Sequence, residues 1–177
     1  AQIASAESEI SSNETKAKRE FANAETQIEN GKTEIAKNAL KLNNQKIEAE
    51  KGFAQAEEQK AGLQSTLDNI NNAIKITDNS IAEKKAELET AETDEEIQAI
   101  NQEIAQLQAT KQVYENNRQS VQAGITEIDN QITSGRAELQ NAEAQINNAK
   151  SELAKKEATL KQTKSKTNTQ IANAKKE

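Results

Sequence analysis

Hydrophobic and small residues recur along the second half of the chain at alternating steps of three and four. This spacing holds from Ile97 to Ala174 without a slip. Apolar positions with this period form the seam of a coiled coil, and such a seam has to face another helix. The pattern predicts one long helix whose seam is Ile97, Ile100, Ile104, Leu107, Lys111, Tyr114, Arg118, Val121, Ile125, Ile128, Ile132, Gly135, Leu139, Ala142, Ile146, Ala149, Leu153, Lys156, Leu160, Thr163, Thr167, Gln170 and Ala174.

The first half carries a seam as well, in two rows of seven-residue spacing. One row is Ile3, Ile10, Ala17, Ala24, Gly31, Asn38, Gln45 and Gly52, and the other is Glu14, Phe21, Ile28, Ile35, Leu42, Ala49, Ala56 and Leu63. The seam then continues as Leu67, Ile70, Ile74, Thr77, Ile81, Lys84 and Leu88. Two steps of four fall together between Gln59 and Leu67, which predicts a stutter that locally unwinds the supercoil.

The clearest break in the pattern lies between the two seams, in residues 89–96. Thr93 and Glu96 have the spacing of a capping box, and Asp94 and Glu95 add negative charge to the first turn of a new helix. We therefore expect an all-α fold, a long antiparallel two-helix coiled-coil hairpin. One arm is predicted at 1–89, the tip at 90–95 and the second arm at 96–177.

Two other architectures stay open from the residues alone. In the first, the chain continues as a single uninterrupted helix, because all of residues 89–96 tolerate a helix. Asp78, Asn79 and Ser80, with Glu83 three residues beyond Ser80, have the residue types of a second helix start and would give a three-helix bundle. The seam keeps its step through this segment, which favours the hairpin.

If the chain folds back near residue 92, the numbers of facing residues add to about 184. At this register small residues lie opposite bulky ones. The predicted pairs are Gly31–Leu153, Ala24–Leu160, Gly52–Ile132, Ala56–Ile128, Leu42–Ala142 and Ile35–Ala149. A close-packed pair of helices needs such a constant volume in each layer. Each arm of about 85 residues would be about 130 Å long.

The composition excludes most kinds of chemistry. The net charge is −6, the charges of both signs are mixed along the chain, and aromatic residues are 2% of the total, so nothing here is typical of nucleic-acid binding. The chain has no histidine and no cysteine, which removes the usual nucleophile relays. We expect no enzyme activity, no cofactor and no metal site.

No apolar run approaches the roughly 20 residues of a membrane span. The chain opens on Ala1 and is periodic to Glu177, so we expect an excised segment of a larger protein, with both ends cut inside a helix.

Four residues are candidates for contacts with another protein. Lys111, Tyr114 and Arg118 are predicted in the seam of the second arm, and Phe53 is predicted beside the seam, on the surface. Seam cations can instead snorkel outward and fix the alignment of two helices, which is the interpretation we favour for Lys111 and Arg118. The same holds for the polar seam residues Asn38 and Gln45.

The stretch from Ser134 to Leu153 has the pattern Gly-x-x-x-Leu-x-x-Ala-x-x-x-Ile-x-x-Ala-x-x-x-Leu, and residues 30–35 repeat its beginning. It resembles the long extracytoplasmic coiled-coil insert of FtsX/MacB-like ABC transporter permeases of Gram-positive bacteria. The resemblance implies a hairpin stalk outside the cell membrane, between two transmembrane helices of its own chain. A separate ATPase subunit and an extracellular protein would be its partners. Its role would be partner interaction or mechanical coupling in transmembrane export.

Other structural coiled coils are alternatives to this interpretation. YhgE/Pip-like membrane proteins carry similar repeats with more Gly-Leu pairs. A membrane-fusion adaptor hairpin would carry an Arg-Leu-Ser type tip, which residues 85–100 lack. An arm of a chromosome-maintenance ATPase and the stalk of a surface adhesin would differ in the sequences that flank them.

Overall fold

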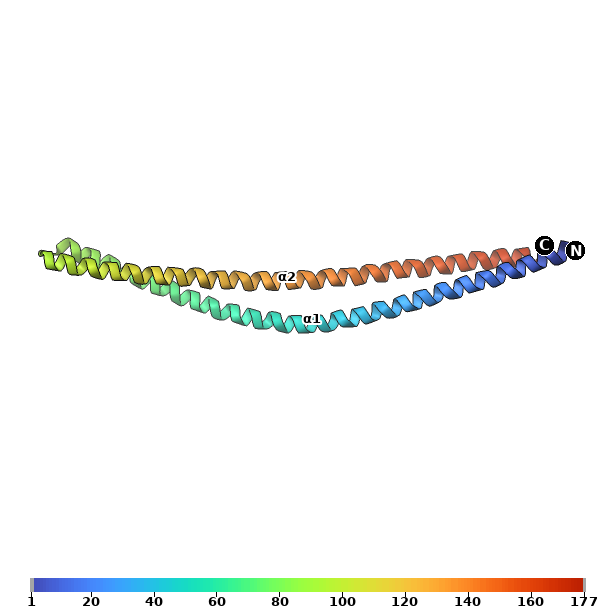
Figure 1. Cartoon of the computed structure of the whole chain (residues 1–177), viewed down its shortest axis with the longest axis horizontal. Helices are drawn as coiled ribbons and strands as arrows, with labels where there is room; N and C mark the ends of the chain where they lie inside the picture. Colours follow the sequence, from blue (N-terminus) through green and yellow to red (C-terminus); the bar gives the residue numbers. More distant parts are fainter. Residues whose placement is uncertain (1, 177) are drawn as a thin grey trace. The chain divides into compact units, whose positions relative to one another are not determined.

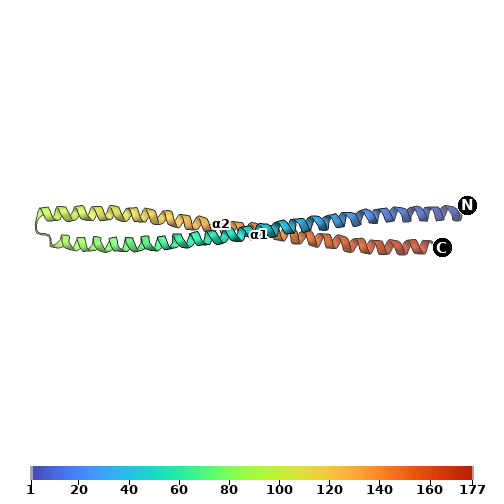
Figure 2. The same cartoon turned by 90° about the horizontal axis from the view of Figure 1, so that it is seen from below.

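Two long antiparallel helices make up the protein. The computed structural model describes residues 2–176, with α1 at Gln2–Thr90, α2 at Asp94–Ala174 and a three-residue connection between them. Figures 1 and 2 show the two helices running in opposite directions from this connection. The predicted two-helix hairpin is confirmed. The three-helix alternative is wrong, because α1 continues unbroken through residues 78–83.

The predicted capping box ends the connection and starts α2. The Glu96 amide donates to Thr93 Oγ1 at 3.2 Å, and the Thr93 amide donates to Glu96 Oε2 at 3.2 Å. The Glu92 amide donates to the same carboxylate oxygen at 3.2 Å. These three hydrogen bonds satisfy amides that a helix start leaves without partners. The hydrogen bonds from Thr93 and then from Glu92 also lower the pKa of Glu96.

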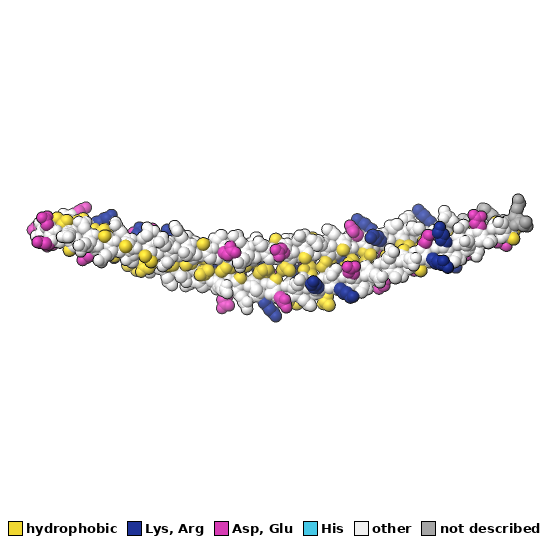
Figure 3. All heavy atoms as spheres, in the orientation of Figure 1, with side chains coloured by type: hydrophobic (Ala, Val, Ile, Leu, Met, Phe, Trp, Pro, Cys, Tyr) yellow, Lys and Arg dark blue, Asp and Glu magenta, His cyan; other side chains and the backbone are white. Residues whose placement is uncertain are grey.

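The residues group into two compact units. Unit 1 comprises residues 1–47 and 137–177, and unit 2 comprises residues 48–136, which include the connection. On the face seen in Figure 3, hydrophobic side chains form a band along the line where the helices meet. The buried aliphatic residues of unit 1 are Ile28 and Leu42, and those of unit 2 are Leu67, Ile74, Ile81, Ile104 and Ile132. Thr77, also buried, donates its hydroxyl to the Ala73 carbonyl at 2.8 Å.

The seam of α1 changes phase earlier than the sequence predicted. It follows the predicted rows from Ile10 to Ile35, while Ile3, predicted in the seam, is exposed. It then passes through Ala39, Lys46, Phe53 and Lys60 instead of Asn38, Gln45, Gly52 and Gln59. The stutter therefore lies at Gly31–Ile35–Ala39, where two steps of four meet, and the predicted stutter between Gln59 and Leu67 is wrong. The extra residue rotates the seam by one position, which moves Phe53 from the surface into the seam.

The seam of α2 changes phase at the matching level of unit 1. It follows the prediction from Ile100 to Leu153, and it then passes through Leu160, Lys164, Thr167 and Ile171. The predicted seam residues Lys156, Thr163, Gln170 and Ala174 are exposed. Two helices that pack along their whole length have to rotate their seams together, so a stutter in one requires a stutter in the other.

Glycines fix the alignment of the two helices in both units. In unit 1 a β-carbon on Gly31 would lie 3.1 Å from Leu153 Cδ1, which confirms the predicted pair. The pair of Gly52 and Ile132 is wrong, because Gly52 is exposed and a β-carbon there would have no neighbour within 4 Å. In unit 2 the Phe53 ring instead lies against Gly135, 2.8 Å from where its β-carbon would be.

We expect Gly135→Leu to destabilise the protein and Gly52→Leu to be neutral or stabilising. The new side chain at Gly135 has to displace the Phe53 ring, and overpacking of this kind costs about 1–3 kcal/mol. The same substitution at exposed Gly52 removes the helix penalty of glycine, about 0.5–1 kcal/mol. Thermal unfolding followed by circular dichroism measures both variants. The opposite ranking would show that Gly52, and not Gly135, lies in the seam.

Candidate functional site

The interface between the two helices is the candidate site, because residues 2–176 show no other concentration of functional groups. Among these residues there is no group of three or more acidic side chains placed to hold a metal ion. No helix in the described part of the chain is long and apolar enough to cross a membrane. The groups that need an explanation are the charged side chains that cross the interface.

Among residues 2–176, seven ion pairs join the two arms of the hairpin, and six of them have the same register. In these six pairs the two residue numbers add to 189. In unit 1 they are Glu14–Lys175, Glu25–Lys164, Lys32–Glu157 and Lys46–Glu143. In unit 2 they are Lys60–Asp129 and Asp78–Lys111. The seventh pair, Lys84–Glu103, lies closer to the connection.

The sign of the charge on α1 changes along this series. Glu14 and Glu25 are followed by Lys32, Lys46 and Lys60, and Asp78 then precedes Lys84, while α2 carries the opposite charge at each level. Exposed ion pairs contribute little individually to stability. A pattern with changes of sign, in contrast, distinguishes one alignment from another.

A slip of the helices by one heptad turns attraction into repulsion in unit 1. In one direction Glu25 would face Glu157, and Lys32 would face Lys150. In the other direction Lys32 would face Lys164, and Lys46 would face Lys150. The charges therefore oppose a one-heptad slip in unit 1, and the paired stutters, which do not repeat every seven residues, oppose it as well.

Lys111, predicted in the seam of the second helix, belongs to this series. Its Nζ lies 2.6 Å from Asp78 Oδ1, and this hydrogen bond raises the pKa of Lys111. Its second carboxylate neighbour, Glu115 Oε1, lies 3.9 Å away. Tyr114 and Arg118 are half-buried in the seam of α2, where they were predicted.

Phe53 differs most from its predicted place. Its ring packs on Gly135, and the Arg136 guanidinium carbon lies 5.4 Å from the ring centroid, within the range of a cation–π interaction. The aromatic ring therefore fills the interface of unit 2 and is not a free contact residue. The prediction placed it outside because the stutter was assigned to the wrong segment.

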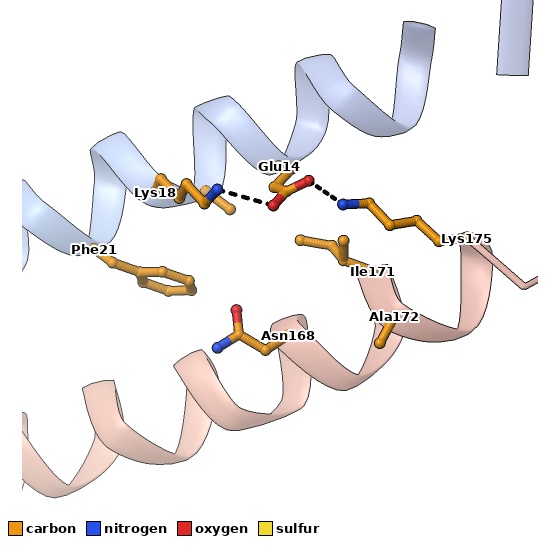
Figure 4. A pocket seen from close by; sticks show the side chains of 8 residues that line it. Glu14, Lys18, Phe21, Asn168, Ile171, Ala172 and Lys175 are labelled. Carbon is orange, nitrogen blue, oxygen red and sulfur yellow. Dashed lines mark hydrogen bonds and ion pairs between the residues drawn. The ribbon is translucent and has the colours of Figure 1, made fainter. Parts of the chain in front are cut away.

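Near the start of α1 and the end of α2, side chains of unit 1 form a cluster around Glu14, shown in Figure 4. Glu14 Oε2 accepts a hydrogen bond from Lys175 Nζ at 2.5 Å, and Glu14 Oε1 lies 2.9 Å from Lys18 Nζ. Lys175, and secondarily Lys18, lower the pKa of Glu14 to about 2. Phe21 and Ile171 line the same surface depression and supply its apolar part.

A shallow groove marks the paired stutters in unit 1. Ile35, Ala39 and Leu153 line it, and the Lys32–Glu157 ion pair, 2.8 Å long, lies at its edge. Small alanines in place of larger side chains leave this part of the interface open. The charged residues of its lining are Lys32, Lys150 and Glu157, and the hydrogen bond to Glu157 raises the pKa of Lys32.

The sequence itself carries a signal for the ion-pair series, in the spacing of its charged residues. Lys32, Lys46 and Lys60 are spaced by fourteen residues, and so are Asp129, Glu143 and Glu157. Equal spacings of opposite charge on two antiparallel helices indicate pairing at a single register. The seam positions of Lys46 and Lys60 were missed because charged side chains do not stand out in a search for apolar positions.

Comparisons with known proteins add no assignment. No protein-family model, curated protein or solved structure matches this chain.

We expect charge reversal at Lys32 and Lys46 to destabilise the helix pair, and reversal on both helices to restore it. Lys32→Glu and Lys46→Glu together would face Glu157 and Glu143 with like charge. Adding Glu157→Lys and Glu143→Lys restores attraction at the same register. The melting temperatures of the double and quadruple variants test this, and a quadruple variant no more stable than the double variant would contradict it.

The end of unit 1 is expected to loosen in acid. The folded-state pKa of Glu14 is lowered to about 2 from 4.5, so its contribution is present above pH 4.5 and is lost as the pH falls towards 2. Spin labels at exposed Ser12 and Asn173 would report a broader distance distribution over this range. Glu14→Gln, which has no charge to lose, should show the broad distribution already at neutral pH.

Proposed function

We propose that this chain is a non-catalytic helical-hairpin stalk of an FtsX/MacB-like ABC transporter permease. It would lie on the extracytoplasmic face of a bacterial membrane and would couple partner interaction or movement to export. Support comes from the seam pattern of residues 134–153 and from the course of the chain in unit 1. There α1 begins and α2 finishes at the same end, as an insert between two neighbouring transmembrane helices requires.

The observation that best supports the proposal is that the two helices are held in one alignment along each other. Ion pairs of changing sign oppose a one-heptad slip, and the contacts of Gly31 with Leu153 and of Phe53 with Gly135 oppose other slips. Helices that cannot slide past each other move together when one of them is displaced. A stalk that transmits movement needs this property, whereas a passive spacer does not.

Cysteine labelling in intact cells tests the location. The chain has no natural cysteine, so Glu95→Cys at the exposed start of α2 gives a single thiol in this segment. A membrane-impermeant maleimide should label it from outside in the full-length protein. Ile132→Cys, at a position 4% exposed, is the matched control and should label only after denaturation. Labelling of Glu95→Cys only after cell lysis would contradict an extracytoplasmic stalk.

Removing unit 2 tests the role. In the full-length protein, residues 48–136 are replaced by a short turn, which leaves the ion pairs of unit 1 in place. We expect export or signalling to fall at least tenfold while the permease still assembles with its ATPase subunit. Unchanged activity of the shortened protein at normal membrane levels would contradict mechanical or partner coupling by the hairpin.

A further inference from the structure

One face of unit 2 carries two exposed aliphatic side chains at one level. Ile76 on α1 and Val113 on α2 are both 57% exposed. Each lies two residues from a member of the Asp78–Lys111 ion pair, and two residues turn a helix by about 200°. Ile76 and Val113 therefore both point away from the ion pair, to the opposite side of the two helices.

Two rows of uncharged residues extend this face in both directions. They follow alternating steps of four and three, so each row keeps to one side of its helix. On α1 the row is Gly62, Thr66, Asn69, Ala73, Ile76 and Ser80, and on α2 it is Gln106, Thr110, Val113, Asn117, Ser120 and Gly124. We call these twelve residues the neutral face. Nine of them are exposed, and Ala73, Ser80 and Gly124 are half-buried.

The two rows cover the same levels of unit 2. At one end, a β-carbon on Gly124 would lie 3.4 Å from Leu63, the neighbour of Gly62. At the other end, the Lys84–Glu103 ion pair joins the helices just beyond Ser80 and Gln106. The neutral face is therefore one continuous strip on both helices, about 27 Å long for eighteen steps of 1.5 Å along each helix.

The absence of charge distinguishes this face from the rest of unit 2. Charged residues are 29% of the chain, so twelve residues would ordinarily include about three. On the opposite side, Lys60, Asp129, Asp78 and Lys111 form ion pairs. Depletion of charge together with exposed aliphatic groups is typical of the centre of a protein interface.

We propose that the neutral face binds the neutral face of a second copy of this chain. Two copies with a net charge of −6 repel each other, and this face is where they can approach without bringing like charges together. A different protein partner would ordinarily be selected by complementary charge, for which the face offers no group. The proposal does not depend on the function proposed above.

The two rows also complement themselves under two-fold symmetry. A two-fold axis along the strip, in the plane of contact, places α1 of one copy over α2 of the other at the same level. Ile76 then packs on the partner's Val113, and Val113 packs on the partner's Ile76. Both copies point in the same direction, and each helix gains an antiparallel neighbour across the contact, as in a four-helix bundle.

The area of the neutral face determines the expected dissociation constant of the dimer. A strip about 27 Å long and two helices wide buries roughly 500 Å² per copy, which is at the lower limit for specific interfaces. We therefore expect a dissociation constant of about 10 μM to 1 mM, measured with the 177-residue chain. Added salt should strengthen the dimer, because it screens the repulsion between the two net charges.

Sedimentation equilibrium of the whole chain from about 10 μM to 1 mM tests the proposal. The expected result is a monomer–dimer equilibrium that Ile76→Lys with Val113→Lys weakens at least tenfold, with unchanged helix content. Leu40→Lys is the matched control: Leu40 is 64% exposed but lies in unit 1, so its replacement should leave the dimer intact.

A charge-swap variant tests the geometry. Ile76→Lys with Val113→Glu places each new lysine against the partner's new glutamate, so it should dimerise at least tenfold more tightly than the two-lysine variant. A monomer throughout the concentration range would overturn the proposal and leave the face to a different protein. A dimer that survives the two-lysine variant would equally overturn it, since its interface would lie elsewhere.

Discussion

The alignment of the two helices along one seam is the constraint on which every other feature depends. A two-helix interface has only one layer, so each apolar residue must meet a matching surface on a single partner helix. The layer is thin enough that even its most buried aliphatic residue, Ile132, stays 4% exposed. Burial alone therefore distinguishes poorly between neighbouring alignments, because seam residues seven positions away present similar surfaces. The choice has to come from features that do not repeat every seven residues.

Three such features occur in this chain. The paired stutters near Ile35 and Leu153 interrupt the repeat in both helices at once. The glycines at 31, 124 and 135 accept specific bulky partners, which larger residues at these positions would displace. The charges across the interface change sign along each helix. Exposed ion pairs add little to the free energy of unfolding, but a slipped alignment also suffers repulsion, so the same charges act more strongly on specificity than on stability.

Sequence reasoning predicted the parts of the fold that have strong local signals. The turn was found because Thr93 and Glu96 form a capping box, and the second seam was found because isoleucine and leucine mark it from Ile100 to Leu153. The α1 seam was misplaced between residues 38 and 59, where alanine and lysine fill most of it. These residues fit either side of a helix, so periodicity alone could not locate the stutter at Ala39. The displaced register then gave a wrong environment for Phe53, the one aromatic candidate expected on the surface. Lys111 lies in the seam of α2 and pairs with Asp78 across the interface, and its role in alignment stays a prediction.

The uneven distribution of charge around the two helices leaves one side of unit 2 available for contact with another chain. In unit 2 the Lys60–Asp129 and Asp78–Lys111 ion pairs lie on one side, where they help to fix the alignment of α1 and α2. The other side carries no charge between Gly62 and Ser80 or between Gln106 and Gly124, although the chain is rich in charged residues. The uncharged strip takes no part in these ion pairs, so it is available for a contact with another chain. A second layer of helices on the uncharged side would cover residues that the first layer leaves half exposed, among them Ala73 and Ser80. Alignment within the chain and association between chains can in this way be assigned to opposite sides of the same two helices.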